Sequence, residues 1–279
     1  MFKNTFLALL IISANAEVAF SQPIQQIDPG KDVAIPGPPV QVSDEAKRSL
    51  ELSVGSQSLN AGYSNWRDVT LRGTYALPGN VVQGELSVNR RFDEDGAFLG
   101  ISDTYTFNED WFGSVAVGAG DGAFYLPRYR VDAALYKKWL ADRSLVTSVG
   151  VGYYNAPDGH IDRSLTLGAA YYFASPWIVE GGVRLNRSSP GSVNTHQPYA
   201  AVTYGRDKQD LVSARYTWGS EGYQAIAADT QLVNFKSREA SVAWRHWLNP
   251  KTGWLISANR YTNPSYHRAG INVGIFHDF

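Results

Sequence analysis

A serine, a histidine and a carboxylate lie close together in one short stretch, and these are the residue types that hydrolysis requires. The group is His160, Asp162 and Ser164. In a hydrolase the serine attacks, the histidine accepts its proton, and an acid orients the histidine. This is the only compact arrangement of the kind, because the other histidines, His196, His246, His267 and His277, stand apart from it.

The surrounding sequence argues against an enzyme. The group falls in a connection between two extended segments, where we interpret it as a solvated polar loop, and His246 lies among aromatic residues typical of a membrane interface. We find no Gly-x-Ser-x-Gly motif, no paired-histidine metal motif and no phosphate-binding glycine loop. We therefore expect no catalytic residue, no cofactor and no metal.

From residue 49 onward, apolar and polar residues alternate with a period of two, and turn residues interrupt the pattern at regular intervals. This pattern predicts an all-β fold, a transmembrane antiparallel up-and-down β-barrel of about fourteen strands over residues 49–279. The expected spans are 49–57, 67–77, 80–92, 97–107, 111–119, 128–140, 145–155, 162–173, 177–187, 196–205, 210–218, 234–247, 253–262 and 268–279.

The last strand ends in Phe279, and Ile271, Val273 and Ile275 alternate with smaller or polar residues before it. A terminal aromatic residue on an alternating strand is typical of outer-membrane barrels and predicts recognition by the barrel assembly machinery. His277 departs from this pattern, because an aromatic residue is usual there.

The amino terminus resembles an export signal over residues 1–21, with a basic start and a short apolar run. Cleavage is expected after Ala16 or after Ser21. Residues 22–48 are rich in proline and glycine and form either a periplasmic leader or a plug for the barrel. The chain has no cysteine, which excludes disulfides and a lipoprotein anchor.

Composition narrows the class of protein further. The 25 basic and 26 acidic residues nearly balance, so nothing indicates a nucleic-acid partner. No apolar run of about twenty residues follows the signal, as a helical membrane protein would require. A barrel needs no such run, because only alternate residues of its strands face lipid.

Aromatic residues flank every second connection, and these connections are short. Such rings are expected at one membrane interface, next to short periplasmic turns, with longer loops such as 120–127 and 219–233 outside. Both termini are then periplasmic in the outer membrane of a Gram-negative bacterium. The predicted interface girdle is Phe107, Trp111, Trp139, Phe173, Trp177, Trp247 and Trp254.

In each strand, the alternate positions that hold polar residues are expected to face the lumen. A charge on the lipid face would cost about 2–4 kcal/mol at mid-bilayer. The predicted inward charges are Arg72, Glu85, Arg91, Arg128, Arg130, Asp132, Lys138, Glu180, Arg184, Arg215, Glu239 and Arg245. This set is mainly basic, so an open lumen would favour anions. The alternative is that the charges pair and brace a narrow or closed barrel. Asp103 has the apolar parity and suggests a β-bulge.

Several segments together resemble the YaiO family of outer-membrane β-barrels over roughly residues 50–279. They are Leu86-Ser87-Val88-Asn89-Arg90-Arg91, Tyr136-Lys137-Lys138-Trp139 leading into Thr147-Ser148-Val149-Gly150, Ala214-Arg215-Tyr216-Thr217-Trp218, and the layout ending in Phe279. The resemblance implies a single barrel domain in the outer membrane. It implies no catalytic residues.

We expect a narrow or gated conduit for small anionic solutes or saccharides, or an accessory envelope component. The alternatives are a structural or docking barrel, for which 219–233 would be the recognition loop, and a lipid or lipopolysaccharide hydrolase. Outer-membrane lipid, the barrel assembly machinery and a small solute or saccharide are the expected partners, and a monomer is the expected state.

Overall fold

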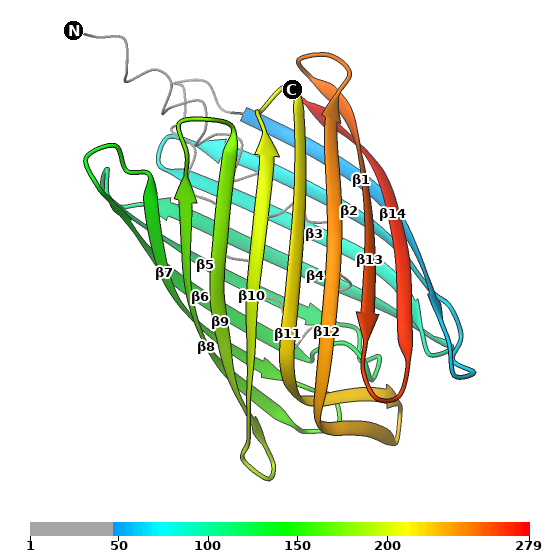
Figure 1. The fold of residues 1–279 in the computed structure, drawn as a ribbon. Coiled ribbons are helices and arrows are strands. Elements are labelled where there is room, and N and C mark those ends of the chain that lie inside the picture. Colours follow the sequence, from blue (N-terminus) through cyan, green and yellow to red (C-terminus); the bar gives the residue numbers. More distant parts are fainter. Residues whose placement is uncertain (1–46) are drawn as a thin grey trace, which may run out of the picture.

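The computed structural model describes residues 47–279, which form one closed antiparallel barrel (Figure 1). Each strand pairs with its neighbours in sequence, and β1 closes the barrel against β14. The predicted signal and nearly all of the predicted leader lie outside the described residues. The fourteen strands are β1 (Lys47–Leu59), β2 (Trp66–Leu77), β3 (Asn80–Arg91), β4 (Glu94–Thr106), β5 (Trp111–Gly120), β6 (Tyr129–Trp139), β7 (Leu145–Asn155), β8 (Ile161–Tyr172), β9 (Trp177–Ser189), β10 (Val193–Gly205), β11 (Asp210–Ala227), β12 (Thr230–Trp247), β13 (Thr252–Thr262) and β14 (His267–Asp278).

Alternation along the strands gives the barrel an apolar outer wall and a largely polar inner wall. On β2, for example, Val69 and Leu71 are 47% and 40% exposed, whereas the intervening Thr70 is 1% exposed. Side chains of a strand point alternately to its two faces, so this difference separates outside from inside. The predicted barrel class and number of strands are confirmed. No helix within residues 47–279 is long and apolar enough to cross a membrane.

The two ends of the barrel differ. We call the end where β1 begins and β14 ends the proximal end, and the opposite end the distal end (upper and lower in Figure 1). Most connections at both ends are short. The longer ones, 60–65 and 121–128, are distal.

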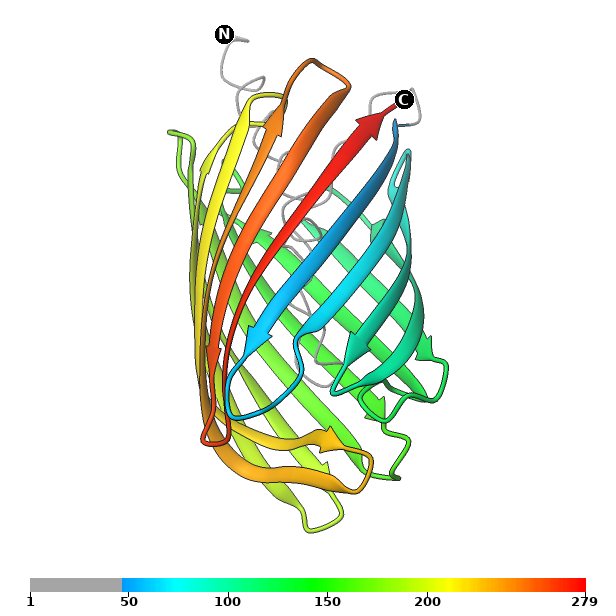
Figure 2. The same ribbon diagram turned by 90° about the vertical axis from the view of Figure 1, so that its right-hand side faces the viewer.

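The expected loop 219–233 is wrong, because most of it belongs to the two longest strands, β11 and β12. Figure 2 shows this hairpin bending across the distal end. Gly219 has φ of 135°, and a Cβ there would lie 2.1 Å from the carbonyl oxygen of His196. The glycines of this segment therefore bend a continuing strand instead of ending it.

The β-bulge expected at Asp103 is also wrong. β3, β4 and β5 keep a continuous register through this residue, so its side chain faces outward. Asn80 donates a hydrogen bond to the Asp103 carboxylate at 3.3 Å on the same outer wall. The outward acid is held by a polar neighbour and not by a change of register.

Candidate functional site

The barrel interior contains most of the predicted inward charges. Arg72, Arg91, Asp132, Lys138 and Arg245 are buried on the inner wall, and Glu85, Arg130, Glu180, Arg184, Arg215 and Glu239 share its parity. Arg128 is the exception. It is exposed in the 121–128 connection, where it donates a hydrogen bond to the carbonyl oxygen of Pro157 at 2.7 Å, so its predicted lumen position is wrong.

Further charges on the inner wall remove the predicted basic excess. Glu51, Asp68, Asp162 and Glu221 are buried and face inward, as does Arg268. With Glu94 and Asp278, which share the inward parity on β4 and β14, the acidic residues inside the described strands at least equal the basic ones. Sequence reasoning missed these acids because they lie near strand ends or in the segment interpreted as a loop, although the parity of Glu51 and Asp68 could have identified them. The basic excess on which the expectation of an anion-selective lumen rested is therefore not found among the described residues.

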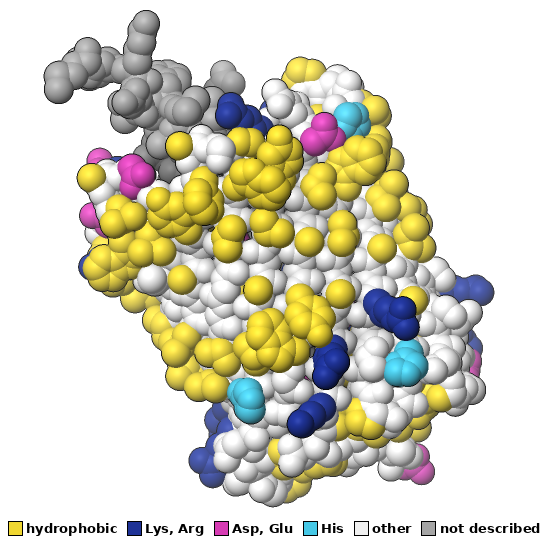
Figure 3. Space-filling model, viewed as in Figure 1, with side chains coloured by type: hydrophobic (Ala, Val, Ile, Leu, Met, Phe, Trp, Pro, Cys, Tyr) yellow, Lys and Arg dark blue, Asp and Glu magenta, His cyan; other side chains and the backbone are white. Residues whose placement is uncertain are grey.

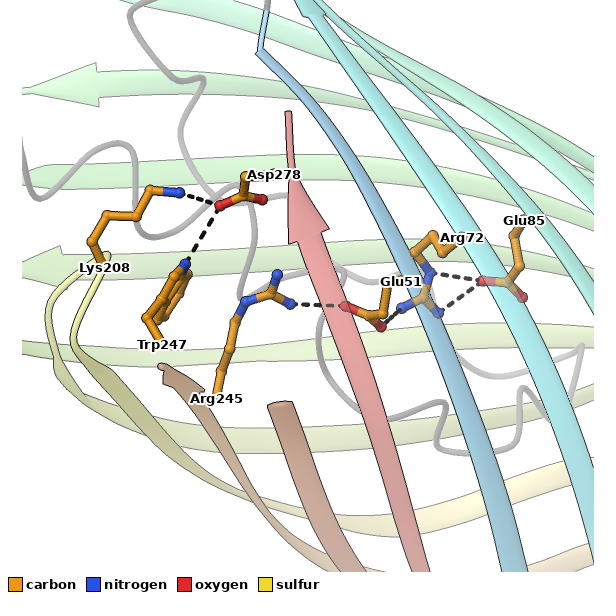
Figure 4. Close-up of polar contacts among 7 residues, drawn as sticks. All are labelled: Glu51, Arg72, Glu85, Lys208, Arg245, Trp247 and Asp278. Atoms are coloured by element: carbon orange, nitrogen blue, oxygen red, sulfur yellow. Dashed lines mark hydrogen bonds and ion pairs between the residues drawn. The ribbon is translucent and has the colours of Figure 1, made fainter. Parts of the chain in front are cut away.

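Four of these residues form a row of alternating charges in the proximal half, which we call the charge chain (Figure 4). The Glu51 carboxylate accepts hydrogen bonds from Arg245 at 2.8 Å and from Arg72 at 3.1 Å. Arg72 also donates to Glu85, at 2.9 and 3.2 Å. Strand register explains part of the row, because Glu51, Arg72 and Glu85 lie directly opposite one another on β1, β2 and β3.

Arg245 joins the charge chain from a strand that does not adjoin β1. Its guanidinium lies 3.5 Å from the centroid of the Phe276 ring on β14 and passes over that ring to reach Glu51. Gly253 makes room for the ring, since a Cβ there would lie 2.3 Å from Phe276. The pair is almost enclosed, with side chains 6% and 11% exposed. Removing one partner of such a pair leaves a buried charge without compensation.

Aromatic and apolar side chains pack together inside the proximal end. Trp247 is buried against Leu211, Leu255 and Phe276, so its predicted place in the interface girdle is wrong. It shares the inward parity of Arg245. Trp244, which is 42% exposed and packs edge-on against Trp254, lies on the outer wall instead. The other predicted girdle residues, Phe107, Trp111, Trp139, Phe173, Trp177 and Trp254, lie on or beside the proximal outer wall.

The outer surface also holds His246 and the predicted assembly signal. His246 lies 5.2 Å from the Trp254 ring and within hydrogen-bonding distance of Asp210, at 2.8 Å, as expected for an interface residue. The exposed apolar residues of the last strand are Ile271, Val273, Ile275 and Phe279. Recognition of this strand by the assembly machinery remains a prediction.

The distal mouth is lined by aromatic rings and two guanidinium groups. Trp66 lies 4.9 Å from the Phe92 ring, and the Arg91 and Arg268 guanidiniums lie 5.1 and 4.8 Å from the Trp66 ring. Arg268 also pairs with Glu239 at 3.1 Å. These cation–π contacts hold basic groups against apolar rings at the mouth.

The 121–128 connection folds against the inner wall at this mouth. Tyr125 is buried beside Phe98, and its hydroxyl donates to the carbonyl oxygen of Asn89 at 3.0 Å. A Cβ at Gly96 would lie 2.6 Å from that hydroxyl, so the glycine permits the close approach. Burial raises the pKa of Tyr125 to about 12, because the phenolate would lose its hydration.

The bent part of the β11–β12 hairpin, residues 219–235, covers the mouth from the other side, and we call it the hairpin arm. Three side chains fasten it to β13 and the following connection. Tyr261 donates to Glu221 at 3.0 Å, Asn263 donates to Gln224 at 3.0 Å, and Gln224 also bonds Tyr266. These contacts all involve ordinary side-chain hydrogen bonds, which can break individually without loss of the fold.

A small cavity of about 30 Å³ remains between the hairpin arm and the 121–128 connection. Tyr154, His160, Asp162 and Tyr223 are among its lining residues. Space for about two water molecules is available in such a volume.

The group that suggested hydrolysis does not assemble into a catalytic arrangement. His160 is within hydrogen-bonding distance of Asp158 at 2.6 Å and stacks on the Tyr223 ring, while Asp162 bonds Ser188. The Ser164 hydroxyl is buried without a hydrogen-bond partner. The interpretation as a solvated loop is nevertheless wrong, because His160 and Asp162 are buried in the mouth. Residues 47–279 contain no cluster of acidic and histidine side chains suited to hold a metal ion.

Comparison with solved structures shows a shared barrel fold at low sequence identity. The CymD monoaromatic hydrocarbon channel aligns with a TM-score of 0.57 at 7% identity, over 85% of this chain and 89% of that one. A TodX deltaS2S3 mutant monoaromatic hydrocarbon channel aligns with a TM-score of 0.54 at 11% identity, over 96% and 93%. These likenesses establish the fold alone.

Sequence comparison is more specific. No curated protein matches the chain. The model of the YaiO membrane beta barrel domain matches residues 47–224, which is most of the described chain. The protein is therefore an outer-membrane β-barrel that belongs to the YaiO family.

Proposed function

We propose that the barrel is a narrow conduit for small polar solutes, with saccharides as the favoured class, and that the hairpin arm gates its distal mouth. The observation that carries the proposal is that three side-chain hydrogen bonds and a small apolar cluster around Ile226 hold this arm against an aromatic mouth. Fourteen strands lie between the eight that side chains can fill and the sixteen to eighteen that leave an aqueous channel.

The lining favours uncharged polar solutes over anions. Between the aromatic ends, the inner wall offers Ser53, Thr70, Ser87, Ser237 and Asn272 as buried hydrogen-bonding groups. Aromatic faces combined with a few convergent polar groups are typical of sites for small organic ligands. The inward charges of the described strands carry no net positive charge that would favour anions.

The test compares the full-length protein with a variant whose hairpin arm is loosened. The double substitution Gln224→Ala and Tyr261→Phe removes the side-chain hydrogen bonds that join the arm to β13 and to the connection after it, each worth about 0.5–1.5 kcal/mol. The open fraction should then rise on the order of tenfold. Asp229→Asn, at the exposed tip of the same hairpin, is the control.

Single-channel conductance in planar bilayers and swelling of vesicles in monosaccharide solutions are the measurements. The proposal predicts rare openings of the natural protein, frequent openings of the double variant, and faster swelling with a monosaccharide than with a trisaccharide. A second candidate, a structural barrel braced by its charge chain, predicts no conductance and no swelling for any of the three proteins.

A further inference from the structure

The distal outer wall carries basic side chains directly beyond its apolar band. On β8 and β9, Leu167 lies opposite Val183 and Leu165 opposite Leu185, all facing outward, and the next outward pair is Arg163 opposite Arg187. Both arginines are exposed. The outer wall thus changes from a pair of leucines to a pair of arginines over two residues along each strand.

The same order of residues recurs elsewhere on the barrel. On β2 and β3, Leu71 opposes Leu86 and Val69 opposes Val88, and beyond them Arg67 opposes Arg90. A third group, Lys236, Arg238 and Arg260, faces outward from β12 and β13. Figure 3 shows lysine and arginine side chains gathered on the distal half of the face that includes β10 to β13.

Two arginines directly opposite each other repel and destabilise a strand pair unless an anion lies between them. Arg163 and Arg187 have no carboxylate partner among the described residues. Arg187 donates to the Ser192 hydroxyl at 3.1 Å, and Arg163 lies 5.9 Å from the Tyr153 ring. In the second pair, Arg90 is partly neutralised by Asp95 at 2.9 Å and Asp93 at 3.9 Å. The Arg163–Arg187 pair is therefore the stronger anion site.

Among residues 48–279, the proximal outer wall carries no such pair of opposed arginines. Its basic residues lie singly over aromatic rings, with Arg48 at 5.2 Å from the Tyr75 ring and Lys137 at 3.7 Å from the Trp139 ring. The two ends are thus built for different lipid interfaces. An outer membrane has such an asymmetry, with phospholipid in its inner leaflet and phosphorylated glycolipid in its outer leaflet.

We propose that the distal basic collar, and the Arg163–Arg187 pair above all, binds the sugar phosphates of an outer-leaflet glycolipid while its acyl chains lie along the apolar strip of Leu165 and Leu185. Paired guanidiniums suit this role because each can contact two phosphate oxygens. The arginine pair lies directly beyond the apolar strip towards the distal end, just as the head group of an outer-leaflet lipid lies beyond its acyl chains. The proposal does not depend on conduit activity, and it places the distal end at the cell surface.

The test measures lipid binding by the full-length protein in detergent with diphosphorylated lipid A as the probe. Native mass spectrometry gives the bound fraction, and heat-dependent gel mobility verifies that each variant is folded. The double variant Arg163→Gln/Arg187→Gln should bind lipid A on the order of tenfold more weakly. Arg48→Gln, an exposed basic residue at the other end, should bind normally. Dephosphorylated lipid A should bind weakly to all.

A second readout separates binding from structure. Without lipid A, a variant that lacks one arginine of the repelling pair should unfold at the same midpoint as the natural protein or at a higher one. With lipid A, the midpoint of the same variant should be lower than that of the natural protein, because the natural protein gains more stability from bound lipid. Equal affinity for phosphorylated and dephosphorylated lipid would overturn the proposal, as would unchanged binding by the double variant. If phosphatidylglycerol bound as well as lipid A, the collar would be a general anionic-lipid surface and the glycolipid assignment would be wrong.

Discussion

Replacing Glu51 by glutamine tests whether the charge chain stabilises the barrel. Glu51 is the centre of the chain and accepts hydrogen bonds from both Arg245 and Arg72. Arg72 keeps Glu85 after the substitution, but Arg245 loses its only carboxylate among the described residues. The outcome therefore depends mainly on the cost of leaving the Arg245 guanidinium uncompensated.

The magnitude follows from the burial of the pair. Breaking a buried ion pair by removing one partner costs about 3–5 kcal/mol. Because glutamine keeps one acceptor oxygen and Arg72 keeps a partner, we expect the lower end, about 3 kcal/mol. Asp95→Asn removes the ion pair with Arg90 on the outer surface, where the side chains are 48% and 75% exposed. That control should cost less than about 1 kcal/mol.

Equilibrium unfolding of the refolded protein in urea, followed by tryptophan fluorescence, measures both values. A loss of about 3 kcal/mol lowers the midpoint by about 1–2 M at an ordinary slope. Adding Arg245→Met to Glu51→Gln should restore part of the loss, because it removes the uncompensated charge. Two results would refute the reasoning. One is that Glu51→Gln lowers the free energy of unfolding by no more than Asp95→Asn does. The other is that Arg245→Met lowers it further when added to Glu51→Gln.

Two further predictions concern the mouth and the outer wall. The raised pKa of Tyr125 means that its contribution to stability is complete below about pH 10 and is lost as pH rises towards 12. The unfolding midpoint of the natural protein should therefore fall more steeply between pH 10 and 12 than that of Tyr125→Phe, and parallel profiles would contradict this. Brominated lipids quench the fluorescence of tryptophans that face the lipid. The part of the fluorescence that they quench should be smaller in Trp244→Phe than in the natural protein, because Trp244 lies on the outer wall. It should be unchanged in Trp247→Phe, because Trp247 lies inside. Equal losses would place Trp247 on the outer wall.

Much of the fold is predictable from the sequence because barrel strands obey a local rule. Alternation of lipid-facing and lumen-facing residues marks each strand without knowledge of its partners. The rule failed at 219–233, which was predicted as a loop although most of it continues β11 and β12. Gly222 allows β11 to approach Ser188, since a Cβ there would lie 2.1 Å from the serine hydroxyl. Such a contact between β11 and β9 is not visible in a local pattern.

The candidate site was less predictable because its contacts are not local. Parity places Arg72 and Arg245 inside, but it cannot show that Arg245 reaches Glu51, 194 residues away in sequence. Trp247 shows a different error, because aromatic spacing suggested an interface although the parity it shares with Arg245 indicates the interior. The basic collar was missed because the cost of an outward charge was taken from mid-bilayer, whereas near the strand ends it falls to about 0–1 kcal/mol.

The reach of Arg245 across Phe276 has a consequence for how the barrel is completed. The pairing of β1 with β14 closes the barrel, and hydrogen bonds from Phe279 to Arg48 and from His267 to Asn60 hold its two ends. A slip of one residue along this seam would turn Glu51 towards lipid and Leu50 and Leu52 inward. The bond from Arg245 to Glu51 forms only in the correct register. It therefore stabilises the observed register of the seam relative to a register shifted by one residue.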